Sequence, residues 1–502
     1  MTVREALPLT PQPATKPHRS VIRSLEGWSD WARLLPLIAL AVLLGLIGLG
    51  SKGLWLDEGL SADIARTNPL TALSAAWNTP TPGAIALYYE ILHFWMILGN
   101  SEFVLRLLSV LCTALAVPVV YLLGRRLAGS RAALIAAFLT AASPFVVEYS
   151  QEARPYAMVL LLSAASSLAL LRAIERPTWR RWIGYAVLAV ASLYVHNTMV
   201  FVFLVHGIWV LINVPIRDRQ FWRVVVAFGA LGVSAFPLAG LLSQPVFTWV
   251  PALTLSRLVS VLNDVAGGTG LLLAFWLGAV GLGTVAALGR LRQGRVGWSA
   301  ALAVALGLVP IVVEVAISIR RPMLEPRYLM MALPGLAVCG GMGIAAIPWR
   351  KVRGLSLALF VALAVPALIP WYTGDPKEGW REAEQVISAE FRPGDGIAVY
   401  PEYCRLPFDF YVVQDASLSS RAVPVYPLAA WGSFFPVPDG EAPIPSTLDG
   451  IHAGNRLWIV SRYALLDSTT EDGRALWSRL AGYKTVETIQ FTGVYVQLVQ
   501  AP

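Results

Sequence analysis

Long, uncharged apolar runs constrain this chain more than any other feature of its sequence. Each run has about 16–22 residues, close to the ~20 that an α-helix needs to cross a bilayer. The runs cover 34–50, 103–123, 132–147, 157–171, 182–196, 198–214, 223–242, 271–289, 298–319, 328–347 and 354–371. With 56% hydrophobic and only 14% charged residues, the chain is also far more apolar than soluble proteins. The sequence therefore predicts an α-helical polytopic membrane protein with about eleven spans.

Basic residues lie in short clusters between these runs. The formal net charge is +8, but the alternation of clusters and spans is typical of the positive-inside rule rather than of a nucleic-acid-binding surface. The clusters are Arg125, Arg126 and Arg131; Arg172, Arg176, Arg180 and Arg181; Arg217, Arg219 and Arg223; Arg290, Arg292 and Arg295; and Arg350, Lys351 and Arg353. We expect them on the cytoplasmic side of a plasma membrane, together with the N-terminal tail 1–33, and no nucleic-acid partner.

The transmembrane domain is predicted to cover 34–371, with a long first external loop at 52–102. An apolar stretch at 84–98 is ambiguous, because a crossing there would move every later basic cluster to the outside. We therefore expect it to lie along the membrane surface as an amphipathic helix. It carries Glu90 and His93, whose spacing on one helix face is compatible with a divalent metal. A simple surface pair is the competing interpretation, since two ligands alone make a weak metal site.

The character of the chain changes after residue 371, where charges, Gly and Pro return and no spanning run follows. An odd number of spans after an inside N-terminus places the segment 372–502 outside the cell. Its pattern predicts a small α/β domain with a helix near 378–391, strands near 396–400 and 456–461, a helix near 473–481 and paired strands near 484–499. Of the three cysteines, Cys112 and Cys339 fall in apolar runs and Cys404 stands alone, so no disulfide framework is indicated.

Charged residues gather in the external loops. The first apolar run is followed by "LWLDEGLSADIA" at 54–65, in which Asp57 and Glu58 are adjacent. The second external loop, around "EYSQEARPYAM", contributes Glu148, Tyr149, Glu152 and Arg154. The loop near 318–328 contributes Arg320, Arg321, Arg327 and Tyr328. Arginines are disfavoured on this side of a membrane, which suggests that an anionic group such as a lipid phosphate offsets the bias.

These residue types suit a transfer reaction at a lipid phosphate. A carboxylate can take a proton from an acceptor hydroxyl as a general base, and guanidinium groups can stabilise the charge that grows on a departing phosphate. The chain has no Gly-rich phosphate loop of the Walker or dinucleotide type. Glycosyl transfer from a membrane-borne phosphate therefore fits the pattern without a nucleotide site.

Several motifs carry a family resemblance. "LWLDEG", "TPTPGAIALYYEILHFW", "YSQEARPYAM" and "EPRYLMMALPGLAV" occur in this order, and the resemblance covers roughly 34–347. Together they resemble the polytopic GT-C glycosyltransferases, in particular the protein O-mannosyltransferase, aminoarabinose transferase and lipopolysaccharide-sugar transferase group. The segment "GWREAEQVISAEFRPGDGIAVY" resembles the outer domain of some bacterial members.

The resemblance implies a polyprenyl-phosphate sugar donor and transfer, with inversion, to an acceptor on the extracytoplasmic side. The acceptor can be a glycan, a lipid or a protein. The residue roles it suggests are Asp57 as catalytic base with Glu58 beside it, Glu152 as partner for the acceptor or a metal, Arg154, Arg320 and Arg327 for the donor phosphate, and Glu90, Glu148, Tyr149 and Tyr328 around the acceptor. In "NTPTPGAIALYY" the charged or histidine residue that precedes this stretch in many relatives is absent, so a metal ligand can be missing.

Simpler interpretations stand beside these assignments. Asp57 and Glu58 can cap an interfacial helix, since acidic residues favour helix N-termini. Arg154 can pair with a loop carboxylate, Arg320 and Arg321 can extend to lipid headgroups, and Glu148 can be a solvated charge. At the level of the whole protein, the alternatives are a membrane transporter or lipid flippase and a non-catalytic envelope-assembly protein.

Overall fold

Helices dominate the computed structural model of the chain. It describes residues 28–66, 86–238, 250–291, 295–374, 377–428, 430, 432, 455–463, 474, 476, 478 and 480–502. Each apolar run found in the sequence overlaps at least one described helix. The helices are α1 (Trp28–Leu46), α6 (Glu102–Leu127), α7 (Ser130–Ala142), α9 (Tyr156–Glu175), α10 (Trp179–Val195), α11 (Met199–Asn213), α12 (Phe221–Ala235), α14 (Gly270–Arg290), α15 (Arg295–Ser318), α16 (Leu333–Ala346) and α17 (Arg350–Thr373).

The lengths of these helices confirm a multi-pass membrane protein. Among the described residues, seven helices are long and apolar enough to cross a membrane, and α7 with the short α8 (Pro144–Ser150), bent by 55°, makes an eighth. Apolar helices at Trp31–Leu46 and Met199–Asn213 are shorter than a full span. The count of eleven spans therefore stays a prediction.

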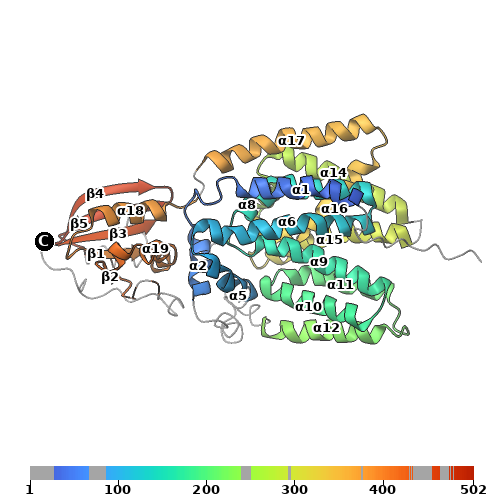
Figure 1. Cartoon of the computed structure of the whole chain (residues 1–502), viewed down its shortest axis with the longest axis horizontal. Coiled ribbons are helices and arrows are strands. Elements are labelled where there is room, and N and C mark those ends of the chain that lie inside the picture. Colours follow the sequence, from blue (N-terminus) through green and yellow to red (C-terminus); the bar gives the residue numbers. More distant parts are fainter. Residues whose placement is uncertain are drawn as a thin grey trace, which may run out of the picture.

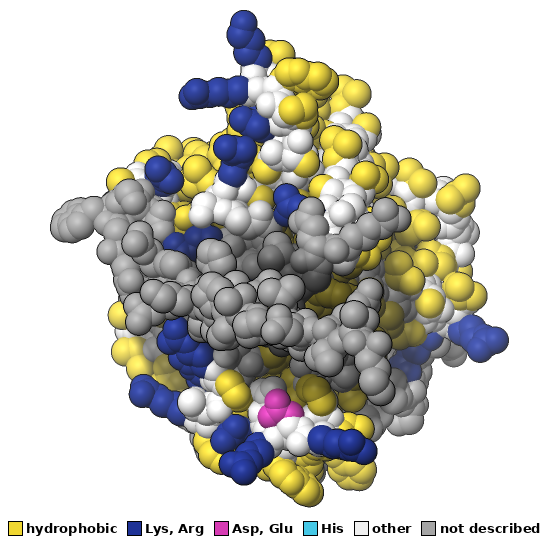
Figure 2. Space-filling model, turned by 90° about the vertical axis from the view of Figure 1, so that its right-hand side faces the viewer, with side chains coloured by type: hydrophobic (Ala, Val, Ile, Leu, Met, Phe, Trp, Pro, Cys, Tyr) yellow, Lys and Arg dark blue, Asp and Glu magenta, His cyan; other side chains and the backbone are white. Residues whose placement is uncertain are grey.

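The helices run side by side, and the C-terminal domain lies at one end of the bundle (Figure 1). Seen from the opposite end, Lys and Arg side chains surround the face and acidic side chains are scarce (Figure 2). The α6–α7, α9–α10 and α16–α17 connections, which carry basic clusters, lie at this end. These three basic connections thus lie at the end of the bundle away from the C-terminal domain, whereas the predicted orientation in the membrane stays a prediction.

Close packing around α16 depends on glycine. A Cβ on Gly283 of α14 would lie 2.0 Å from the carbonyl oxygen of Cys339, and one on Gly335 would lie 2.2 Å from the amide nitrogen of Gly307 in α15. Inside a bilayer, where lipid is as apolar as leucine, small residues drive helix association by letting backbones approach closely. The glycines of this apolar region thus place α16 at the centre of the bundle, against both α14 and α15.

Among the described residues before the C-terminal domain, three amphipathic or short helices are not counted among the spans. The first is α2 (Leu56–Arg66) and the second is α5 (Ala86–Trp95), which confirms a helix within 84–98, although its position along the membrane surface stays a prediction. The third, α13 (Leu255–Ala266), was not predicted. It begins at an N-cap where the Thr254 side chain accepts a hydrogen bond from the Arg257 amide, and it ends at Gly267 with a φ of 118°. A strongly amphipathic helix of this length is easily missed by a search for spanning runs.

The C-terminal domain is a five-stranded sheet with helices. Its elements are α18 (Trp380–Glu390), β1 (Gly396–Tyr400), α19 (Arg405–Val412), β2 (Val423–Tyr426), β3 (Arg456–Arg462), β4 (Lys484–Phe491) and β5 (Val494–Gln500). The strand order is β2-β1-β3-β5-β4. β1 is parallel to β2 and β3, whereas β5 is antiparallel to β3 and β4.

Most of the predicted elements of this domain are confirmed, namely the helix near 378–391, the strands near 396–400 and 456–461 and the paired strands near 484–499. The predicted helix near 473–481 lies largely outside the described residues. β2 was missed because it is only four residues long and contains Pro424, which is tolerated at the sheet edge where β2 lies. All three cysteines are free and buried, as expected.

The first external loop meets the C-terminal domain through α2, which lies across the end of the bundle and packs on α19 (Figure 1). At the contact, a Cβ on Gly59 would come within 2.5 Å of the Cα atom of Pro407. The absence of a side chain at this position therefore sets how closely the two helices approach.

We predict that Gly59→Ala weakens this contact, because an added methyl group would force backbone movement and overpacking costs typically ~1–3 kcal/mol. The measurement is the thermal unfolding temperature of the detergent-purified protein. Gly229→Ala is the matched control, since nothing lies within 4 Å of a Cβ at that helical glycine. Equal unfolding temperatures for the two variants would contradict the tight contact.

Candidate active site

Asp57 lies in the first turn of α2 and faces two arginines. Its Oδ2 atom accepts a hydrogen bond from Arg327 Nη1 at 3.2 Å and lies 3.7 Å from Arg154 Nη2. The Asp57 side chain keeps 23% of its surface exposed, whereas those of Arg154 and Arg327 keep 8% and 14%. The site therefore combines a reachable carboxylate with two nearly buried cations, an excess of positive charge that favours a further anion.

The two arginines lie far apart in the sequence and belong to different elements. Arg154 follows α8, and its Nη1 donates to the Asp57 carbonyl at 3.1 Å and to Ser61 Oγ at 3.0 Å, so it also holds α2. Arg327 lies in the 3₁₀ helix η4 (Pro326–Ala332), and its guanidinium lies 5.6 Å from the Trp55 ring centroid. Both guanidinium groups are thus held by contacts within the protein.

A row of aromatic rings extends from this site. The ring centroids of Tyr149 and Tyr156 are 5.2 Å apart, those of Tyr156 and His196 are 5.7 Å apart, and those of His196 and Tyr328 are 5.4 Å apart. The Arg154 guanidinium lies 5.9 Å from the Tyr156 centroid. The structure therefore brings two predicted acceptor residues, Tyr149 and Tyr328, close to the Asp57 cluster, and adds Tyr156 and His196 between them.

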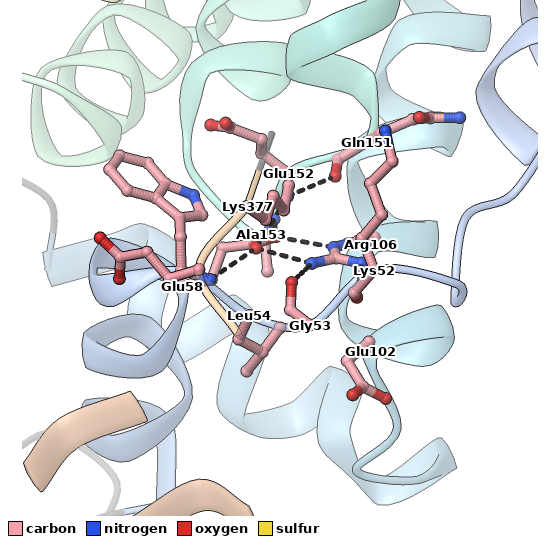
Figure 3. Close-up of polar contacts among 12 residues, drawn as sticks. Lys52, Gly53, Leu54, Glu58, Glu102, Arg106, Gln151, Glu152, Ala153 and Lys377 are labelled. Atoms are coloured by element: carbon pink, nitrogen blue, oxygen red, sulfur yellow. Dashed lines mark hydrogen bonds and ion pairs between the residues drawn. The ribbon is translucent and has the colours of Figure 1, made fainter. Parts of the chain in front are cut away.

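Glu58, although adjacent in sequence, has a different environment (Figure 3). Its Oε1 accepts from Arg106 Nε and from the Ala153 amide, both at 2.8 Å. Its Oε2 accepts from Arg106 Nη2 at 2.7 Å and from Lys377 Nζ at 2.8 Å. The side chain is fully buried. Burial by itself would raise the pKa of Glu58, but the charges and hydrogen bonds of Arg106 and Lys377 lower it to about 2. The occupied oxygens of Glu58 indicate a positioning role beside Asp57.

Arg106 and Lys377 were missed by the sequence analysis. Arg106 also donates to the carbonyls of Leu49 (3.0 Å), Lys52 (2.8 Å) and Gly53 (2.7 Å), and so fixes the turn between α1 and α2. One signal was available for it: an arginine near the start of a spanning run is costly unless it is paired. No local pattern pointed to Lys377, whose partner Glu58 is 319 residues away in the sequence.

Glu152 is another buried carboxyl near the site. Its side-chain Oε2 has no hydrogen-bond partner among the described residues. Burial raises the pKa of Glu152 to about 8; the positive charge of Lys377 opposes the rise, and Glu58 and Glu148 add to it. Burial and the neighbouring carboxylates thus favour the protonated form of Glu152, whereas Arg106 and Lys377 favour the ionised form of Glu58.

The other predicted site residues differ in burial and in the elements that carry them. Glu90 is buried on α5, and His93 Nδ1 is 2.6 Å from the carbonyl oxygen of Ala65, which ties α5 to the end of α2. Glu148 is half-buried on α8, and Arg320 is exposed after α15. Among the residues that the structure describes, no group of three or more His, Cys, Asp or Glu side chains could hold a metal. A divalent metal stays a prediction, and the proline-rich stretch before α5 lies outside the described residues.

An ion pair that the sequence analysis did not predict holds the segment that precedes Arg327. Arg257 of α13 pairs with Glu325, and its Nη2 also donates to the Leu324 carbonyl at 3.2 Å. Both partners immediately precede η4. The amphipathic helix α13 therefore holds the segment that delivers Arg327 to Asp57.

Comparisons with known proteins identify the architecture. Residues 83–240 match the family model described as dolichyl-phosphate-mannose-protein mannosyltransferase. The chain is similar to ArnT from Cupriavidus metallidurans in the apo state, with a TM-score of 0.57 and 16% identity over 94% of this chain and 98% of that chain. It is also similar to ArnT bound to undecaprenyl phosphate, with a TM-score of 0.55, 16% identity and the same shares.

A further similar structure is the arabinofuranosyltransferase AftD from Mycobacteria, with a TM-score of 0.52 and 16% identity over 94% of this chain and 41% of that chain. No curated protein matches the sequence. The chain is a polytopic membrane protein with the GT-C glycosyltransferase fold, which confirms the resemblance found in its motifs. The family match over 83–240 supports its classification as a glycosyltransferase.

We predict that Glu58→Gln lowers the free energy of unfolding by about 3–5 kcal/mol, because it leaves the buried charges of Arg106 and Lys377 without their anion. Thermal unfolding in detergent measures the loss. Glu390→Gln is the control, since this α18 carboxylate is exposed. A loss no larger than that of the control would refute a central role for this ion pair.

The ion pairs of Glu58 also predict that the free energy of unfolding depends on pH. The pKa of Glu58 falls from its ordinary 4.5 to about 2 on folding, so its stabilisation is complete above pH 4.5 and is lost as the pH falls towards 2. Over this window the wild type should lose stability that Glu58→Gln does not lose. Parallel stability curves for the two proteins would contradict the assignment.

Proposed function

We propose that this protein transfers a sugar from a polyprenyl-phosphate donor to an acceptor hydroxyl at the extracytoplasmic face of the plasma membrane, with inversion at the anomeric carbon. The observation that carries the proposal is the partly exposed Asp57 carboxylate held between Arg154 and Arg327. A base and a phosphate-binding pair are the two groups that this reaction needs at one place.

The reaction follows from the chemistry of these groups. The Asp57 carboxylate removes the proton of the acceptor hydroxyl, whose oxygen attacks the anomeric carbon from the face opposite the phosphate. The bond between the anomeric carbon and the phosphate oxygen breaks, and polyprenyl phosphate leaves with the bonding electron pair. Arg154 and Arg327 stabilise the negative charge on that phosphate, because charge-assisted hydrogen bonds from guanidinium suit phosphate oxygens. The products are the glycosylated acceptor, polyprenyl phosphate and protonated Asp57.

The donor class and the orientation rest on separate support. ArnT, whose fold is similar, has been solved with undecaprenyl phosphate bound. Basic side chains surround the end of the bundle opposite the C-terminal domain (Figure 2), which by the positive-inside rule favours an inside N-terminus and an outside C-terminal domain. The acceptor, whether glycan, lipid or protein, would then meet the donor at the end where Asp57 lies.

Asp57→Asn tests the base. We expect it to lower the transfer rate by about 10²–10⁴-fold, the usual worth of general acid–base catalysis, and to keep binding of the donor. Transfer would be measured with purified protein in nanodiscs, a panel of radiolabelled polyprenyl-phosphate sugars and membrane extract as acceptor source. Glu390→Gln again serves as the exposed carboxylate control.

Transfer by the wild type with an unchanged rate in Asp57→Asn would move the base to another residue. No transfer from any donor by the wild type would favour a transporter, a flippase or a non-catalytic assembly protein.

Two arginines of the 318–328 loop, Arg320 and Arg327, allow donor binding to be distinguished from the effect of a surface charge. Arg327→Gln removes a cation from the Asp57 cluster and should weaken binding of polyprenyl phosphate by about 10- to 100-fold, the worth of a charged hydrogen bond of ~1.5–3 kcal/mol. Arg320→Gln removes an exposed charge and should change the dissociation constant less than about threefold. Native mass spectrometry with added polyprenyl phosphate compares the two. The reverse order would place the phosphate near Arg320 instead.

A further inference from the structure

The edge of the C-terminal sheet at the carboxyl ends of β1 and β3 lies towards the bundle (Figure 1). β1 and β3 are parallel and end at Tyr400 and Arg462. In α/β domains the carboxyl ends of parallel strands form the usual ligand-binding edge. In this protein, side chains next to that edge contact the first external loop, so the edge is occupied by the protein's own chain.

Glu378 makes the first of these contacts. Its Oε2 accepts from the Leu56 amide at 3.1 Å and from Trp380 Nε1 at 2.7 Å. Its Oε1 accepts from Arg462 Nε at 2.8 Å and from Tyr463 OH at 2.9 Å. The first amides of a helix lack partners within the helix, and a carboxylate there also interacts favourably with the helix dipole. Glu378 therefore caps α2 from another domain, one residue before Asp57.

Lys377 makes the second contact. Its Nζ donates to Glu58 Oε2 at 2.8 Å and to the Gln151 carbonyl at 3.2 Å, and its side chain is 4% exposed. It thus joins the first turn of α2 to the second external loop, the two segments that supply Asp57 and Arg154. A buried ammonium is costly unless it is paired, so its position depends on Glu58.

The turn before α2 is held in the same way. Tyr411 OH of α19 accepts from the Leu54 amide at 2.7 Å. Arg381 Nη2 of α18 donates to the Lys52 carbonyl at 3.1 Å. The C-terminal domain therefore holds the backbone that leads to Asp57 at two positions before α2 begins, in addition to the Leu56 amide.

We propose that the C-terminal domain positions the base of the transfer reaction, with Lys377 as the positioning residue that locks the first turn of α2. This inference rests on the proposed function only for its kinetic consequence, since the positioning itself is structural. A displacement of about 1 Å in a reacting group can cost ~10²-fold in rate. The domain then acts on catalysis without touching donor or acceptor.

The experiment uses the full-length protein with Lys377→Met, which keeps a long side chain but removes the charge, and Lys377→Arg, which keeps the charge. Hydrogen exchange followed by mass spectrometry reports on the peptide that covers the start of α2. Lys377→Met should speed exchange there about tenfold or more, and Lys377→Arg should restore much of the protection. In transfer assays, Lys377→Met should lower kcat at least tenfold and change the KM for the donor less than about threefold.

Arg456→Gln is the matched control, because the Arg456–Asp395 pair at 2.6 Å is largely buried within the C-terminal domain. Arg456 donates to Asp395 and to the Glu390 carbonyl, and not to a described residue of the first loop. It should leave exchange in α2 unchanged. If Lys377→Met fails to fold, Glu378→Gln replaces it with the same expected exchange pattern.

Unchanged exchange in α2 would overturn the inference, as would an equal rise in exchange across every described helix, which would indicate general loss of structure. If the wild type transfers no sugar, the proposed function fails, but the exchange data still decide whether the domain positions α2. An increase in the acceptor KM alone would assign the domain to acceptor binding instead and would also overturn the inference.

Discussion

The buried Glu58 carboxylate, bound by Arg106 and Lys377, is the interaction on which the rest of the site depends. Through four short hydrogen bonds it joins α2, α6, the second external loop and the segment that enters the C-terminal domain. These segments are brought together from four distant parts of the chain. In a low-dielectric interior a buried charge is costly once it loses its partner, so each member of the network keeps the others in place. The helix that carries Asp57 is fixed by this requirement rather than by the strength of α2 alone.

The Asp57–Glu58 pair illustrates how environment separates two identical chemical groups. Successive residues of a helix point about 100° apart, so Glu58 turns into the protein and Asp57 turns towards Arg154 and Arg327. Glu58 has every strong acceptor position occupied, whereas Asp57 keeps about a quarter of its surface exposed, 23%, with two cations beside it. Divergent environments for neighbouring carboxyl groups are how enzymes give them different roles. Here one serves structure, and the other is placed for chemistry.

Features with a local cause could be predicted from the sequence, and features with a distant cause could not. The spanning helices and the sheet strands follow from run length and alternation, and α5 follows from an apolar stretch too short to cross. Asp57, Arg154 and Arg327 were expected at one face because the span count puts their loops on the same side of the membrane, and the structure brings them together. Lys377 and α13 were missed, since the first is defined by a partner hundreds of residues away and the second by an amphipathic pattern outside the spans. Arg106 was within reach, because an arginine inside an apolar run needs a partner.

The most direct test of this account is a cryo-electron microscopy structure of the nanodisc-embedded protein with bound polyprenyl phosphate. The account predicts that the phosphate lies within hydrogen-bond distance of Arg154 and Arg327, with the Asp57 carboxylate free to face the acceptor side and the Glu58 network unchanged. A phosphate bound at Arg320, or anywhere that leaves the Arg154–Asp57–Arg327 cluster without contact to the lipid, would contradict it.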